Sequence, residues 1–456
     1  MNITIFHKLI IPSLLLILTL LNFACQTAES AKLRTAKSSA LDSLAWVQKE
    51  SYKLPALAVG IIKDDKIIYA KGFGVRSLSS QEAVTTKSIF HMASVSKPFT
   101  ATAIMQLVEQ GKIDLDKPLI SYLPYFTMLD KRYKDIRIRQ MLNHTSGLAD
   151  VEDYEWDKPQ FDVEAAERYS REFHNDSLDF APGTDYSYSN TAFNILSDVI
   201  AKVSGLTFED YMKTHIFEPV GMTNSTFYQP DVPKSLATQP HILDQSFKVK
   251  VSPTYPYNRI HAPSSTLQSN IEDMLKWAQL YLNKGTINGK QVFSESTYEQ
   301  LIKAQVSIGG KDSICISWFS RSLGTYKKYE HNGGDLGYKT HFAFLPEKSM
   351  AVVVMTNGHY FPAWISADTF LQLVLDEKPL QPWAIPIHLK LSEHILTDGV
   401  EKCKEIYFHE KENNPDQYLF MPWCLTEFKY WLLDRNHQTE ALAIEKFSQE
   451  LKAMKE

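Results

Sequence analysis

The β-rich segments of this chain lie at the two ends of a mostly helical stretch. Near the N-terminus, Ala56–Ile62 and Lys66–Ala70 flank a two-residue acidic turn, which predicts a hairpin. Two further β-rich runs, THFAFLPEK and MAVVVMTN, come late in the sequence and precede a helix expected over Ala363–Leu375. This order favours an α+β fold: an antiparallel sheet built from both ends of the chain, flanked by helices, with an inserted helical subdomain.

The middle of the sequence shows the apolar spacing of helices. One helix is expected to begin at Ser94 and end at Gly111, and a second is expected in SNTAFNILSDVIAKVSG. A third, SNIEDMLKWAQLYLNKG, has Ser269 as its expected N-cap and Gly285 as its stop. Together with the strands, these helices define one domain, which we place at residues 41–375.

The N-terminus has the features of an export signal. Its apolar run is too short to span a bilayer comfortably and is interrupted by Pro12, so residues 1–25 are interpreted as a signal peptide. The segment ends with a small residue before Cys25, which resembles the lipobox of bacterial lipoproteins and makes Cys25 the expected lipidation site. Small polar residues at 26–40 would then form a flexible tether. We therefore expect a periplasmic or surface lipoprotein of the bacterial cell envelope, held to the membrane by lipid; ordinary secretion is the alternative.

Charge and cysteine content exclude several classes of function. The 456-residue chain has a formal net charge of −5, which gives no basic surface for nucleic acid. Beyond Cys25 there are Cys315, Cys403 and Cys424; none forms a CxxC pair and no HExxH occurs, so neither a metal site nor a cofactor is expected. Export permits disulfides, and Cys403 with Cys424 is the candidate pair, whereas Cys315 is expected to be buried as a small apolar group.

The composition changes after Asp376. The stretch EKPLQPWAIPIH is rich in proline and is typical of a linker, and the remaining sequence predicts a helix, a polar turn and a second helix. We therefore assign residues 376–456 to a linker and a small helical C-terminal extension. A single helical hairpin cannot bury its own apolar face, so this one should pack on the main domain or on a partner. Its role and the oligomeric state are left open by the sequence.

Ser94 and Lys97 form a Ser-x-x-Lys motif where a helix is expected to begin. Helical spacing places the two side chains on one face, and the small or apolar flanking residues should desolvate the lysine and lower its pKa toward neutrality. Pro98 is tolerated only in a first helical turn, so Ser94 should lie at the helix start with its backbone N–H free to stabilise an oxyanion. The alternative is an ordinary cap, with Ser94 or Ser96 as N-cap and Lys97 in solvent.

A hydrolase also needs a second proton carrier and a second oxyanion donor. Candidates occur in DYSYSNTAF, which contains Tyr188 and Asn190, and in EHNGGDLGY, which contains His331 followed by Gly333 and Gly334. The latter segment comes just before a predicted strand. Its glycines would let a backbone approach a ligand closely.

Taken in order, Ser94-x-x-Lys97, Tyr188-x-Asn190 and His331-x-Gly333 resemble the three motifs of class C β-lactamases and penicillin-binding proteins. The resemblance extends from about Leu54 to Leu375 and includes the stretches IRIRQMLNHTSGL, APGTDYSYSN, IFEPVGMTNS and FLPEKSMAVVVMTNG. It implies the β-lactamase/transpeptidase-like fold and a serine that is acylated during the reaction. Each motif alone is short and remains a hypothesis until its structural context is seen.

The resemblance also implies a role for each residue. Ser94 would be the nucleophile, Lys97 its proton-exchange partner, and Tyr188 a base and acid whose pKa is depressed by the Lys97 ammonium. Which of Lys97 and Tyr188 holds the proton at each step is left open. The remaining roles concern substrate binding: Asn190 would bond Lys97 and the substrate carbonyl, His331 and Gly333 would line the substrate along a strand edge, and the N–H groups of Gly334 and Ser94 would form the oxyanion hole.

His331 departs from the family pattern. β-Lactamases and D-Ala-D-Ala peptidases usually have lysine there, and this permanent cation recognises the substrate carboxylate; an imidazole attracts an anion less, and its charge varies with pH. The sequence therefore predicts an exported serine hydrolase acting on a small-molecule or peptide substrate, an ester or amide that includes D-amino-acid peptides as candidates. The alternatives are a β-lactamase or D-Ala-D-Ala carboxypeptidase, and a non-catalytic penicillin- or peptidoglycan-binding lipoprotein. The substrate itself is not identified.

Other polar residues near these motifs have structural interpretations. His144 should organise the turn in LNHTSGL, and His91 is expected to support the site indirectly. The irregular stretch SPTYPYNRIHAPSS contains Tyr255, Tyr257 and Arg259, and a loop beside the substrate cleft is one of two interpretations for it.

Overall fold

The computed structural model describes residues 39–376 and 384–454. The expected signal peptide and the lipidation site Cys25 lie outside the described residues, and so does the expected tether except for residues 39 and 40. These two residues begin a helix over residues 39–51, so the first described element starts slightly before the expected domain boundary. Within the described ranges, no helix combines the length and the apolar character needed to cross a membrane.

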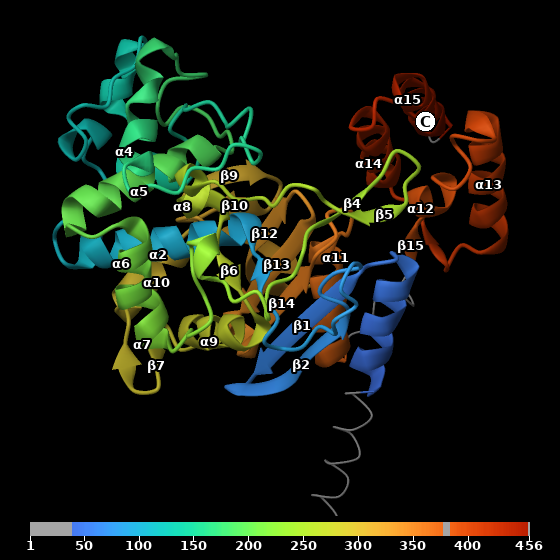
Figure 1. Ribbon diagram of the computed structural model, residues 1–456, viewed down its shortest axis with the longest axis horizontal. Helices are drawn as coiled ribbons and strands as arrows, with labels where there is room; N and C mark the ends of the chain where they lie inside the picture. The colour runs from blue at the N-terminus through green and yellow to red at the C-terminus, as the bar shows by residue number, and fades with distance from the viewer. Residues whose placement is uncertain (1–38, 377–383, 455–456) are drawn as a thin grey trace, which may run out of the picture.

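An eight-stranded antiparallel sheet forms the centre of the domain (Figure 1). Its strand order is β2-β1-β14-β13-β12-β11-β10-β9, so the N-terminal hairpin pairs with the last strand, as the sequence predicted. The register pairs Val59 with Val354, and both strands are buried along nearly their whole length because helices cover both faces of the sheet. The strands are β1 (Ala56–Lys63), β2 (Lys66–Gly74), β9 (Val306–Gly309), β10 (Asp312–Ile314), β11 (Phe319–Leu323), β12 (Tyr326–Asp335), β13 (Tyr338–Leu345) and β14 (Met350–Thr356). The predicted α+β fold is confirmed.

Helices of the inserted part cover one face of this sheet and extend from it as a separate lobe, at the left of Figure 1. Phe99 of α2 and Trp277 of α9 stack there with ring centroids 3.7 Å apart. The predicted N-cap of α9 was wrong by one residue, because the side chain of Asn270, not Ser269, accepts from the N–H of Asp273. The helices are α2 (Ser96–Glu109), α3 (Ile138–Leu142), α4 (Ala165–Ser170), α5 (Asn190–Ser204), α6 (Phe208–Met212), α7 (Glu218–Val220), α8 (Ala262–Ser265), α9 (Ile271–Leu282) and α10 (Glu295–Ile302).

Short two-stranded sheets connect these elements. They pair β3 (Phe90–His91) with β6 (Gln268–Ser269), β4 (His241–Leu243) with β5 (Val249–Val251), β7 (Thr286–Ile287) with β8 (Lys290–Gln291), and β15 (Ile385–Pro386) with β16 (Tyr418–Leu419). The pairing of β3 with β6 matters for the site, because it fixes the segment that leads into Ser94.

The other face of the sheet is covered by the helix at 39–51, by α11 (Ala363–Leu375) and by the C-terminal extension. α11 has the predicted bounds. The predicted terminal helix pair is present, preceded by two further helices, and the four together form the lobe at the right of Figure 1: α12 (Ile387–Leu391), α13 (Gly399–Asn413), α14 (Pro422–Leu433) and α15 (Gln438–Ala453). Phe428 and Leu432 of α14 belong to the same buried cluster as Val59 of the sheet. The extension therefore packs on the main domain.

The candidate disulfide is not formed. Cys403 and Cys424 are both free and buried, and their thiols face the backbone oxygens of Leu391 and Leu419 respectively. Each cysteine fills space as a small apolar group, as was expected only for Cys315, which is also free and buried. The question of whether Cys403 pairs with Cys424, which the sequence left open, is therefore answered in the negative.

Candidate active site

Ser94 lies in a tight turn that leads directly into α2. The turn is a short 3₁₀ helix, η1 (Ala93–Val95), and α2 begins two residues after Ser94, so the predicted helix start is displaced slightly. Ala93 has a φ of 49°, a left-handed conformation that costs energy in a residue other than glycine and often marks a functional segment. The capping interpretation was wrong: the N-cap of α2 is Val95, with no side-chain bond, and the Ser96 hydroxyl donates to the carbonyl of Ala93.

Lys97 is fully buried and makes three hydrogen bonds. Its Nζ lies 3.0 Å from Ser94 Oγ, 2.5 Å from Asn190 Oδ1 and 2.9 Å from the carbonyl oxygen of Ser264. Burial lowers the pKa of Lys97 to about 7, against the opposing charges of Asp335 and Asp150. The expected desolvation of this lysine is therefore present, and its amine can exchange a proton near neutral pH.

The three partners of Lys97 are not equivalent. The oxygens of Asn190 and Ser264 can only accept, so they take two N–H groups in either charge state of the amine. When Lys97 is neutral, it has two N–H groups and one lone pair, and the lone pair is left for the hydroxyl of Ser94. This arrangement is the one that a general base needs toward its nucleophile.

Asn190 is held by a carboxylate that sequence reasoning missed. It is the first residue of α5, whose N-cap Ser189 accepts from the N–H of Ala192. Asp150 Oδ1 accepts from both the backbone N–H and the side-chain Nδ2 of Asn190, at 2.7 and 3.0 Å. These contacts fix the amide so that Oδ1 faces Lys97.

Tyr188 is half-buried beside Ser94 and Lys97. Lys97 Nζ lies 4.8 Å from the centroid of its ring, and the ring of His144 stacks on it with a centroid distance of 4.3 Å. Burial raises the pKa of Tyr188 far above its usual range, although a hydrogen bond with Ser94 acts in the opposite direction. The implied depression of this pKa by Lys97 was therefore wrong: desolvation is the largest influence and raises the pKa, so the phenol stays neutral at physiological pH.

His331 lies behind Tyr188, on the buried face of β12. Its side chain is 1 % exposed. The centroid of its ring lies 6.4 Å from the ring centroid of Tyr188 and 5.4 Å from that of Phe319. Nδ1 lies 2.7 Å from the carbonyl oxygen of Asn332, which can only accept, so Nδ1 carries the proton and Nε2 presents a lone pair. Among the described residues, Nε2 has no partner. Burial and then the charge of Lys97 lower the pKa of His331 to about 3. The imidazole is therefore neutral at physiological pH and lacks the permanent charge that a lysine would have.

The end of β12 offers a free backbone edge beside Ser94. In the described part of the chain, β11 pairs with β12 only as far as Glu330, whereas β13 pairs with it as far as Asp335. Gly333 is required at this edge, because a Cβ there would lie 2.2 Å from the carbonyl oxygen of Met92. Gly333 and Gly334 line one cleft together with Ser94. The expected oxyanion donors, the N–H groups of Ser94 and Gly334, would act in this cleft.

Two contacts tie the β12–β13 hairpin to the segment before Ser94. Thr340 Oγ1 donates to the carbonyl of Met92 at 2.7 Å, and His91 Nε2 lies 2.7 Å from Asp335 Oδ2. The hydroxyl of Ser265 also donates to Asp335. His91 is fully buried and does not line the cleft, so its interpretation as an indirect support agrees with its position.

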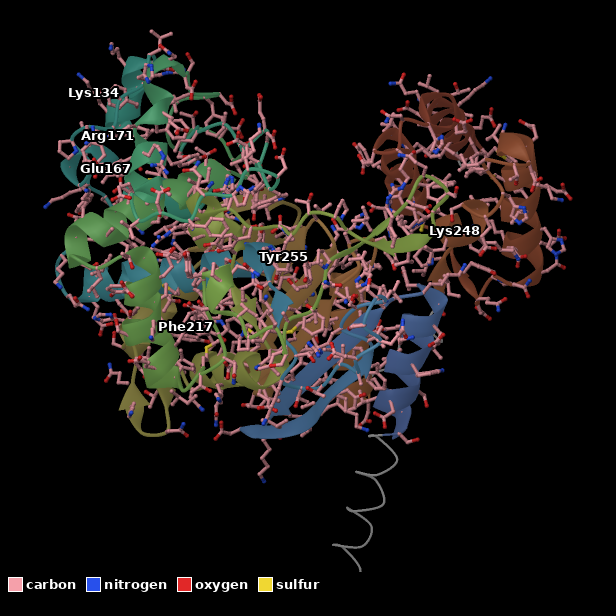
Figure 2. All side chains as sticks on the ribbon, viewed as in Figure 1. Lys134, Glu167, Arg171, Phe217, Lys248 and Tyr255 are labelled. Atoms are coloured by element: carbon pink, nitrogen blue, oxygen red, sulfur yellow. The ribbon has the colours of Figure 1, made fainter. Side chains whose placement is uncertain are left out.

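The irregular stretch around Tyr255 belongs to the body of the protein. Tyr255, near the centre of the view in Figure 2, donates to Gln268 Oε1 at 2.8 Å. Tyr257 is buried, and the guanidinium of Arg259 bonds both carboxylate oxygens of Glu209 at 2.8 Å. These three residues do not line the cleft that contains Ser94, which favours packing over the alternative of a substrate loop.

Comparison with known proteins identifies the family and agrees with the fold. The family model described as Beta-lactamase matches residues 41–376. The chain is 26% identical to a beta-lactamase of Escherichia coli over 68% of its own length and 86% of the relative's, and 35% identical to penicillin-binding protein 4* of Bacillus subtilis over 36% of each protein. The octameric penicillin-binding protein homologue of Pyrococcus abyssi superposes with a TM-score of 0.67 at 26% identity, over 75% of this chain and 78% of that one. The chain belongs to the Beta-lactamase family, whose members are typically serine hydrolases.

Proposed function

We propose that this protein is a serine hydrolase that forms an acyl-enzyme at Ser94 on an ester or an amide. The observation that carries the proposal is the hydrogen-bond set of Lys97, which leaves one position of its Nζ for Ser94 Oγ, at 3.0 Å. A buried amine with a pKa of about 7 is matched to proton transfer at neutral pH. Export to the cell envelope is part of the proposal and rests on the N-terminal sequence.

Lys97 acts as the base during acylation. Its neutral amine takes the proton of Ser94 as Oγ attacks the substrate carbonyl, and the N–H groups of Ser94 and Gly334 stabilise the oxyanion. Tyr188, held as a neutral phenol by burial, donates to the leaving group and is reprotonated through Lys97. In deacylation, neutral Lys97 takes a proton from the attacking water by way of Tyr188. The proton returns to Ser94 Oγ as the bond between Oγ and the acyl carbon breaks and the carboxylic acid leaves.

The pH dependence of the reaction tests the role of Lys97. Because the neutral amine is the reactive form, kcat/KM for an ester should fall below a pKa near 7, by about tenfold for each further pH unit, and level off above it. Asn190→Asp should move this acidic limb upward, since a carboxylate beside Nζ stabilises the ammonium form. A profile that is flat from pH 5 to pH 8 would contradict Lys97 as the base.

The substrate preference follows from the neutral state of His331. We expect hydrolysis of p-nitrophenyl acetate and of D-alanyl p-nitroanilide, with kcat/KM for nitrocefin at least about 100-fold lower, because no permanent cation stands at His331 to bind the carboxylate of a β-lactam. The three substrates are compared on one enzyme preparation, with Ser94→Ala as background. Nitrocefin hydrolysis as fast as that of the ester would instead favour the β-lactamase alternative. The absence of turnover for all three would favour the non-catalytic alternative.

A further inference from the structure

The cleft at Ser94 does not end at the family domain. It encloses about 370 Å³ and is lined by Gly333 and Gly334 next to Ser94. Its far part is formed by the first turn of α11 and by the C-terminal extension. The residues from α11 and the extension are Trp364, His388, Trp423 and Glu427, and Lys339 of β13 and Tyr360 line the cleft beside them. Since the family match ends at residue 376, His388, Trp423 and Glu427 lie outside the matched region, in the extension.

The wall that the extension provides is fixed in place. Phe428 and Leu432, on the helix that carries Trp423, are fully buried in the cluster shared with the central sheet. At the end of the same helix, Arg435 donates to the carbonyl oxygens of Asp244 and Leu243 at 3.1 and 3.3 Å. A buried apolar contact and a polar one therefore hold α14 against the main domain, and Trp423 is presented by a rigid element.

The chemistry of this wall favours an aromatic group. Trp364 is 42 % exposed and Trp423 is half-buried, and both line the cleft with Tyr360. Aromatic side chains of this size bind other rings through burial and through edge or stacked contacts. Lys339 and Glu427 bring opposite charges to the same cleft, which supplies the polar positions common at ligand sites.

His388 is the second observation that points to a ligand. Its side chain is 2 % exposed, its ring lies 6.1 Å from that of Trp423, and within the described residues neither ring nitrogen has a partner. Burial lowers the pKa of His388 to about 3, so the ring is neutral and has one donor and one acceptor to offer. Buried polar groups are normally hydrogen-bonded, and a ligand that enters the cleft and displaces the side chains covering His388 would supply the missing partner.

We propose that Trp364, His388 and Trp423 bind a bulky aromatic group of the substrate, so that the C-terminal extension is a specificity element of the site. The group is attached to the carbonyl that Ser94 attacks, on its acyl or its alcohol side. This inference rests on the proposed hydrolase function, which it deepens by naming the class of substrate.

Two matched pairs of esters test the inference. On the acyl side, p-nitrophenyl 4-phenylbutyrate is compared with p-nitrophenyl acetate; on the alcohol side, 2-naphthylmethyl acetate is compared with methyl acetate. The wild type should favour the aromatic member of at least one pair. Trp423→Ala, and separately Trp364→Ala, should lower kcat/KM for that ester by about tenfold or more and leave its small counterpart within about threefold. Tyr430→Ala is the matched control, because Tyr430 lies on α14, is 54 % exposed and does not line the cleft.

The outcomes distinguish a failure of the specificity role from a failure of the proposed hydrolase function. If small esters are hydrolysed but neither tryptophan variant changes either ratio, the specificity role is overturned while the hydrolase stands. If no ester is hydrolysed, the proposed function fails, and calorimetric titration of 2-naphthylmethyl acetate still tests the cleft. Its Kd should then rise about tenfold on Trp423→Ala and stay unchanged on Tyr430→Ala; an unchanged Kd in both variants, or no binding to the wild type, overturns the inference.

Discussion

Ser94→Ala should abolish hydrolysis of every ester that the wild type turns over, lowering kcat by at least about 10⁴-fold. The alanine removes only the hydroxyl, so Asn190 and Ser264 still hold the amine of Lys97 and the fold should stay intact. A fluorophosphonate probe should label the wild type once per chain, at the peptide that contains Ser94, and should not label the variant. Mass spectrometry of the labelled peptide checks both statements.

Ser96 provides a control two residues away. Its hydroxyl donates to the carbonyl of Ala93 and accepts from the N–H of Leu267, so it supports the turn and does not face the substrate. Ser96→Ala should therefore lose stability by about 1 kcal/mol or more, since a buried partner is left unsatisfied, yet still react with the probe. Labelling that survives Ser94→Ala, or turnover that survives it, would remove Ser94 from the mechanism.

The sequence predicted those parts of the site that depend on local spacing. Ser94 and Lys97 are three residues apart on one helical segment, and periodicity with the flanking apolar residues was enough to place their side chains together and to anticipate a desolvated amine. The central pairing of β1 with β14 was also accessible, because both strands show continuous apolar runs. Motif order supplied Tyr188 and Asn190.

The missing parts depend on contacts between distant segments. Asp150 bonds Asn190 across a separation of 40 residues, and Asp335 meets His91 across 244, with no local pattern to indicate either pair. The raised pKa of Tyr188 and the strongly lowered pKa of His331 were not foreseen for a related reason. Their pKa values are set mainly by burial among residues from other elements, which no single segment of sequence shows. The same holds for Trp423, which reaches the cleft only because the extension docks on the sheet.

Lys97→Met should separate activity from stability. Methionine keeps an unbranched side chain but has no amine, so kcat/KM for esters at pH 8 should fall by at least about 10³-fold, the range expected when a general base is lost. Stability should respond differently. In the wild type, folding lowers the pKa of Lys97 from 10.5 to about 7, which costs about 4 to 5 kcal/mol at neutral pH because the unfolded chain binds the proton more tightly. Methionine removes that cost but leaves the oxygens of Asn190 and Ser264 without a donor, at about 1 to 3 kcal/mol each.

These terms nearly cancel at pH 7, so the sharper measurement is the pH dependence of unfolding. For a lysine with a lowered folded-state pKa, the unfolded state holds more protons between the two pKa values. Denaturant titrations of the wild type should therefore show this group's contribution to the free energy of unfolding rising from about pH 7 to about pH 10. In Lys97→Met that rise should be smaller by about 4 kcal/mol, whereas Lys112→Met, at an exposed position, should keep it. An equal rise in both variants would show that the amine of Lys97 is not desolvated. The inactivity of Lys97→Met could then not be explained by the loss of a base with a lowered pKa.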